Sequence, residues 1–226
     1  MLDDLYAAFA DVTRPSSLDG CPCCVAPGED RPLLDRPLRD LTPDDLGRYA
    51  AKALNTWGGP DDLRYFAPRL LELAAADDLD AEPICLKLAQ AGWRDWPQRD
   101  AVTAFLDAFW SRTLARFPSR PSAGTALCAL GGAAADLAPR LSAWGRLDST
   151  TAIRHLHAFT TDELTWRRGR PRLLNAFWDD TGVAYEQVVA WLTGGDAAEA
   201  VRDAFERTDD EEILDLLIRT EERLTP

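Results

Sequence analysis

The chain has no long hydrophobic run. Its longest uncharged stretch, residues 121–135, consists largely of small residues and is shorter than the roughly 20 apolar residues that a membrane-spanning helix needs. The N-terminus is acidic, where a signal peptide requires positive charge followed by an apolar segment. The sequence therefore predicts a cytoplasmic protein that does not span a membrane.

Positive charge is also scarce. The chain has 25 Lys and Arg residues against 38 Asp and Glu residues, which gives a formal net charge of −13. Such a mean field repels a phosphate backbone or an anionic lipid surface, so we expect neither nucleic acid nor a membrane as a partner. The only concentrated basic patch is Arg167-Arg168-Gly169-Arg170. We interpret this patch as a solvated turn, with an anion site as the alternative.

Familiar catalytic signatures are missing from the sequence: it has no P-loop, dinucleotide fingerprint, H-E-x-x-H motif or nucleophile elbow. The two histidines, His155 and His157, are two residues apart in an expected helix, so their rings should point to different faces and either pack or lie exposed to solvent. The pairs Asp61-Asp62 and Asp179-Asp180 could serve an enzyme, but helix capping explains each pair equally well. The sequence therefore favours a non-enzymatic protein over an enzyme.

Period-two runs of Val, Ile and Thr are absent, whereas apolar residues recur at three- and four-residue spacing along most of the chain, which predicts helices. The clearest helix begins at Thr42, a capping residue followed by Pro43, and is expected to end at Gly58-Gly59. Pro68 is expected to divide the next helix. A further helix is expected from Arg170-Pro171 through Trp178.

These patterns predict an all-α fold, namely an irregular multi-helix array that could take the form of stacked helical hairpins of the HEAT or armadillo kind. A length of 226 residues fits a single helical domain over residues 1–226, with a sub-division near 118–122 as the alternative. Most of the eight tryptophans lie on apolar faces and are expected in the core. Trp93 and Trp96 are the exceptions, since a loop position would let them anchor a ligand or partner.

Three of the five cysteines, Cys21, Cys23 and Cys24, follow Asp19-Gly20 in a C-P-C-C sequence. Cys21 and Cys24 have the spacing of a metal knuckle, which predicts a site for a soft cation such as zinc with Cys23 as a further ligand. A structural zinc ion needs a fourth ligand, for which the candidates are Cys85, Cys128, His155 and His157. Reactive or regulatory thiols, and inert buried cysteines, are the alternatives.

Four segments, 21–24 (CPCC), 37–42 (PLRDLT), 48–58 (RYAAKALNTWG) and 64–73 (RYFAPRLLEL), together resemble a family of uncharacterised bacterial helical proteins with an N-terminal CPCC loop. The resemblance spans about the first third of the chain. It implies that the cysteine loop and the two helices after it form one unit. It implies no reaction, because that family has no assigned activity.

Two functional hypotheses follow from these observations. Capped amphipathic helices without a catalytic constellation predict a non-enzymatic helical module that binds a protein or peptide. The alternative is a zinc-binding or thiol redox-responsive protein that uses Cys21, Cys23 and Cys24. The two hypotheses differ in where function lies, on a helical groove or on the N-terminal loop.

Overall fold

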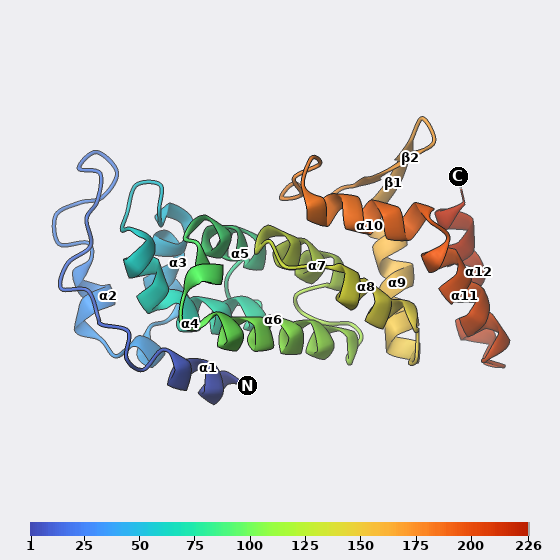
Figure 1. Ribbon diagram of the computed structural model, residues 1–226, viewed down its shortest axis with the longest axis horizontal. Coiled ribbons are helices and arrows are strands. Elements are labelled where there is room, and N and C mark those ends of the chain that lie inside the picture. The colour runs from blue at the N-terminus through green and yellow to red at the C-terminus, as the bar shows by residue number, and fades with distance from the viewer. Residues whose placement is uncertain (226) are drawn as a thin grey trace. The chain divides into compact units, whose positions relative to one another are not determined.

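The computed structural model describes residues 1–225, and over this range the chain forms twelve α-helices, two 3₁₀-helices and one two-stranded antiparallel sheet (Figure 1). The predicted all-α fold is confirmed, whereas the stacked-hairpin form stays a prediction. The chain divides into two compact units, of which the first is Met1–Ala108 and the second begins at Phe109. The connector at 118–122 lies inside the second unit, where it leads into a helix.

The first unit contains seven complete elements and the first part of an eighth: α1 (Leu2–Ala8), α2 (Arg31–Asp35), η1 (Leu38–Asp40), α3 (Pro43–Lys52), α4 (Pro60–Ala76), α5 (Ala81–Gln90), η2 (Trp93–Asp95) and the start of α6 (Arg99–Leu114). The second unit contains the rest of α6 and the elements α7 (Ala123–Gly132), α8 (Ala138–Gly145), α9 (Thr150–Asp162), β1 (Leu164–Arg167), β2 (Arg170–Leu173), α10 (Val183–Thr193), α11 (Asp196–Glu206) and α12 (Glu211–Leu224). None of the helices in residues 1–225 combines the length and the hydrophobicity needed to traverse a lipid bilayer.

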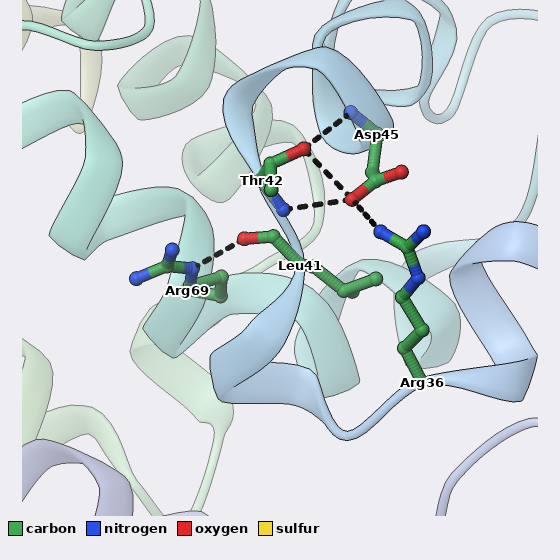
Figure 2. Close-up of polar contacts among 5 residues, drawn as sticks. All are labelled: Arg36, Leu41, Thr42, Asp45 and Arg69. Carbon is green, nitrogen blue, oxygen red and sulfur yellow. Dashed lines mark hydrogen bonds and ion pairs between the residues drawn. The ribbon is translucent and has the colours of Figure 1, made fainter.

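The start of α3 is the best-defined helix cap of the first unit. The Thr42 hydroxyl accepts a hydrogen bond from the Asp45 amide at 3.2 Å, and the Asp45 carboxylate accepts one from the Thr42 amide at 2.9 Å (Figure 2). Arg36 binds the same carboxylate at 2.7 Å, while Arg69 of α4 donates to the Leu41 carbonyl at 2.8 Å. The hydrogen bonds from Thr42 lower the pKa of Asp45. The cap therefore also connects the segment before α3 to α4.

The end of α3 differs from the sequence prediction. The helix stops at Lys52, and Leu54 adopts a positive φ of 65°, so that Trp57 lies on a returning segment and not on the helix. The prediction that Trp57 is buried is correct, because its ring packs edge-on against Tyr49 at 5.6 Å between centroids. Tyr49 in turn contacts Phe66 at 4.7 Å. Burial of the indole is thus achieved from a turn, which apolar spacing alone does not distinguish from a helix.

Two further predictions for the first unit are wrong. α4 runs without a break through Pro68, since the residues around it, including Phe66 and Leu70, are buried and their packing offsets the roughly 3 kcal/mol that an internal proline costs. Trp93 and Trp96 are only 4% and 8% exposed. Both tryptophans therefore belong to the core and are not ligand anchors.

The core of the second unit is centred on Trp144, which is fully buried in α8. Its indole stacks on Trp191 at 5.5 Å and meets Trp110 and Phe159 edge-on at 5.4 and 5.6 Å. Its Nε1 donates a hydrogen bond to the Ala152 carbonyl at 3.0 Å. One aromatic residue thereby joins α6, α8, α9 and α10.

A β-hairpin occupies the place where a helix was expected from Arg170-Pro171, so that prediction is wrong. β1 and β2 pair in register, with Leu164 opposite Leu173 and Arg167 opposite Arg170. The two residues between the strands have positive φ values of 54° and 73°, which is the backbone of a type I′ turn and fits the twist of a hairpin. Figure 1 shows the hairpin projecting from the helices of the second unit.

We expect Thr42→Ala to lower the free energy of unfolding by about 1 kcal/mol, because the side-chain half of the α3 cap is lost. Urea denaturation followed by circular dichroism measures this change. The control is Thr103→Ala, at an exposed position inside α6, where alanine is the better helix former and no loss is expected. An equal loss in both variants would contradict the assigned role of the cap.

Candidate metal centre

The cysteine loop lies between α1 and α2 and is fixed to the segment that follows α3. The Cys21 amide donates a hydrogen bond to the Thr56 carbonyl at 2.8 Å, and the Gly58 amide donates to the Asp19 carbonyl at 2.7 Å. Gly20 and Trp57 form an antiparallel bridge between these two bonds. The backbone just before the first cysteine is therefore held like a short strand against the core.

A tight turn follows at Cys21. The amides of Cys24 and Val25 both donate to the Cys21 carbonyl, at 2.8 and 2.9 Å. This turn brings the Val25 side chain so close to Gly20 that a Cβ added at Gly20 would lie 2.9 Å from the Val25 Cβ. Only glycine fits at position 20 without a shift of the turn, so the Gly20-Cys21 sequence is part of the loop geometry.

The turn gathers the three thiols on one side of the loop. The Cys21 and Cys23 sulfurs are 2.9 Å apart, the Cys23 and Cys24 sulfurs are 3.6 Å apart, and all three lie within 4.8 Å of one another. A tetrahedral site with metal–sulfur bonds of about 2.3 Å places its sulfurs about 3.8 Å apart. Both of the sulfur–sulfur distances given above are shorter than this value, so the thiols would have to move apart by a side-chain adjustment to hold a metal ion.

The three thiols are not equivalent. A hydrogen bond from the Cys23 thiol, supported by the backbone amides of Cys23 and Cys24, lowers the pKa of Cys21. The same contacts, from Cys21 first and then Cys24, raise the pKa of Cys23 to about 11. Cys21 therefore loses its proton more readily than Cys23 does.

Two cations from α3 contact the loop. Arg48 donates to the Cys24 carbonyl at 3.1 Å, and the Lys52 ammonium contacts the same oxygen. Arg48 also forms an ion pair with Glu29. Because the two cations are four residues apart, they lie on one face of the helix. Their positive charge, held at the Cys24 carbonyl, would offset the net −1 of a divalent ion bound by three thiolates.

The candidates for a fourth ligand have other surroundings. Within residues 1–108 no further His, Cys, Asp or Glu side chain joins the three sulfurs. Cys85 is buried in α5, where burial raises its pKa to about 12, and Cys128 is buried in α7. The His155 ring contacts the Arg116 carbonyl at 2.8 Å, and the His157 ring contacts the Thr220 hydroxyl at 3.2 Å. His155 is buried and His157 is half-buried, and each ring has a partner away from the cysteine loop.

The two carboxylate pairs also have local structural roles. Asp62 accepts a hydrogen bond from the Gly59 amide at 2.7 Å and so caps α4. Asp179 accepts from the amide and hydroxyl of Thr181 at 3.0 and 2.7 Å, which lowers the pKa of Asp179. Capping and turn formation account for these two side chains.

The sequence interpretation found the three thiols but missed the residues that support them. Arg48 and Lys52 have an i, i+4 spacing that could have indicated a shared face. Thr56 acts through its backbone carbonyl, for which the sequence offers no signal.

No protein-family model, no curated protein and no solved structure matches this chain. The resemblance to bacterial CPCC-loop proteins therefore stays a prediction. The class that the structure defines is an all-α protein with a three-thiol loop attached to the face of a helix.

We expect iodoacetamide at about pH 7.5 to modify Cys21 faster than Cys23, because the lower pKa leaves more of Cys21 as thiolate. Peptide mapping by mass spectrometry after short exposures measures both rates. Cys23→Ala should slow the reaction at Cys21, since it removes the side-chain donor that stabilises the anion. Cys128→Ala is the control and should leave both rates unchanged. Faster modification of Cys23 would contradict the assignment.

Proposed function

We propose that this protein binds a soft metal ion, zinc in the first instance, through Cys21, Cys23 and Cys24. The observation that carries the proposal is the convergence of three sulfurs within 4.8 Å on a loop attached to α3. Thiolates are the preferred protein ligands of zinc and of monovalent copper. A loop that already holds three of them near bonding separation loses little conformational entropy when the ion binds.

Metal binding accounts for the loop better than a thiol redox role does. A disulfide would use two of the three sulfurs and leave the third without a function, whereas one ion uses all three. The cations at the Cys24 carbonyl also suit a site that carries excess negative charge from three thiolates. A disulfide is neutral and would not need them.

A site with three protein ligands leaves one coordination position of a tetrahedral ion for water or an external ligand. Structural zinc sites are closed by four protein ligands, and catalytic or exchanging sites keep a position open. The proposed centre therefore belongs to the exchangeable type. Because thiols must lose protons to bind the ion, we expect its affinity to fall as the pH is lowered.

We expect protein loaded with zinc and then desalted to retain about one ion per chain, measured by elemental analysis. Cys21→Ser, Cys23→Ser and Cys24→Ser should each reduce retention markedly, since each removes one of three ligands. Cys85→Ala is the matched control, because it removes a thiol that lies outside the group, and it should retain the ion.

Thermal unfolding gives a second measurement of the same proposal. Chelator should lower the melting temperature of loaded wild-type protein and of Cys85→Ala, and should have no effect on the three serine variants. The proposal is wrong if wild-type protein retains no zinc, copper or cadmium, or if the serine variants retain as much as the wild type.

A second candidate function, recognition of a peptide, is favoured by a groove in the second unit. Helices α8, α10 and α11 line an open groove of about 620 Å³, whose apolar floor includes Leu141 and Trp191. Its rim on α11 carries Asp196, Glu199 and Asp203, three or four residues apart on one helical face. None of these three carboxylates has a cationic partner within residues 1–225. Arg146 and Arg207 also line the groove, but Arg146 forms an ion pair with Asp148 and Arg207 donates to the Arg146 carbonyl. The excess negative charge therefore lies on α11, and the occupant that fits is a basic amphipathic helix.

We expect a fluorescently labelled, lysine-rich amphipathic helical peptide to bind this groove, measured by anisotropy. The variant Asp196→Asn, Glu199→Gln, Asp203→Asn should weaken binding by about tenfold or more, as loss of several ion pairs at a partly buried rim implies. The matched control, Asp11→Asn, Asp78→Asn, Glu222→Gln, changes the net charge equally at exposed positions elsewhere. Equal weakening in both variants would reject the groove as the binding site.

A further inference from the structure

The hairpin of β1 and β2 concentrates positive charge in a strongly acidic protein. Arg167, Arg168, Arg170 and Arg172 lie within six residues, while the whole chain has a net charge of −13. Arg167 is directly opposite Arg170, and Arg172 is two residues further along β2. Because paired residues share a face and alternate residues return to it, Arg167, Arg170 and Arg172 lie on one face of the ribbon.

The opposite face attaches the ribbon to the second unit. Leu164 and Leu173 are buried there, and the Trp166 indole donates a hydrogen bond to the Arg223 carbonyl of α12 at 2.7 Å. The arginine positions alternate with these anchored ones and are exposed. The arginines are therefore presented outward by a fixed support.

This arrangement is unfavourable without a ligand. Like charges directly opposite in an antiparallel pair destabilise it, and Arg167 faces Arg170. Arg168 has φ of 54° at the first central turn position, where asparagine, aspartate or glycine is preferred. Across residues 1–225, Arg167, Arg168 and Arg170 have no acidic partner, and Arg172 approaches Asp180 only at 4.0 Å. A bound anion would offset this repulsion.

The arginines also border a concave surface. The hairpin and one face of α10 line a groove of about 790 Å³. Tyr185, Val189 and Thr193 form the α10 wall, each four residues from the next. The Tyr185 ring is half-buried and offers an aromatic wall beside the cationic one.

We propose that this groove binds a small ligand with two or more adjacent phosphate groups. Guanidinium groups recognise phosphate through paired hydrogen bonds, and three arginines on one ribbon face suit more than one phosphate. The β1–β2 strands are four residues long, so the cationic face extends for only about 13 Å. The acidic remainder of the protein repels a long polyanion, which favours a small phosphorylated molecule over nucleic acid.

The test is isothermal titration calorimetry of the full-length protein with tripolyphosphate and with ATP, at about 50 mM and 150 mM salt. We expect saturable binding that weakens with salt. The variant Arg167→Gln, Arg170→Gln should bind both ligands about tenfold more weakly or worse, as loss of charged hydrogen bonds implies. The control Arg99→Gln, Arg202→Gln changes the net charge equally at two exposed arginines and should bind as the wild type does.

Arg168→Asn separates ligand binding from folding. In the absence of ligand it should raise the melting temperature, because asparagine suits the turn better, and it should still weaken phosphate binding. Tyr185→Leu tests whether the natural ligand is a nucleotide or a phosphate chain without a base. If the variant binds ATP more weakly than the wild type does but binds tripolyphosphate equally well, the ligand is a nucleotide; if it binds both as the wild type does, the site recognises the phosphate chain itself.

The proposal is overturned if wild-type protein binds neither ligand at about 1 mM, a concentration at which even a weak site is occupied. It is also overturned if the control loses as much affinity as Arg167→Gln, Arg170→Gln. If the protein binds a single-stranded oligonucleotide more tightly than tripolyphosphate at equal phosphate concentration, the proposal of a small ligand is wrong and the groove is a nucleic-acid site. None of these measurements depends on the cysteine loop.

Discussion

The pairing of the backbone at 19–21 with that at 56–58 is the constraint on which the cysteine loop depends. Two hydrogen bonds, from Cys21 to Thr56 and from Gly58 to Asp19, fix a segment that has no helix or strand of its own. Trp57 lies in the same short bridge and packs against Tyr49. The position of the Cys21 thiol is thereby tied to the hydrophobic core, so a change in the packing around Trp57 would shift the loop.

The early end of α3 makes this arrangement possible. If the helix continued to Gly58, the Thr56 carbonyl would point along the helix axis, as helical carbonyls do, and not sideways to the Cys21 amide. The chain instead turns at Leu54, and the second half of α3 directs Arg48 and Lys52 to the Cys24 carbonyl. One helix thus supports the loop at both its beginning and its end, through backbone on one side and cations on the other.

Charge is distributed unevenly in a molecule whose average is strongly acidic. The thiol loop contacts two cations from α3, the hairpin carries four arginines, and the groove of α8, α10 and α11 has an acidic rim. Net charge describes the long-range field, whereas each of these surfaces acts over the distance of an ion pair or hydrogen bond. The three surfaces therefore favour ligands of different chemistry.

The sequence by itself determined the helical class, the cap at Thr42 and the choice of Cys21, Cys23 and Cys24 as the candidate ligands. These features are local, since capping, apolar spacing and a C-P-C-C turn depend on residues within a few positions of one another. It could not decide that Trp57 is buried from a turn, that α4 continues through Pro68, or that Trp93 and Trp96 join the core, because each depends on partners distant in sequence. The hairpin at Leu164–Leu173 is a similar case, since four-residue strands are specified by pairing and by anchors such as the Arg223 carbonyl. The tertiary structure alone brought Arg48, Lys52 and Thr56 to the thiols, because contacts between separate segments form only when the core packs.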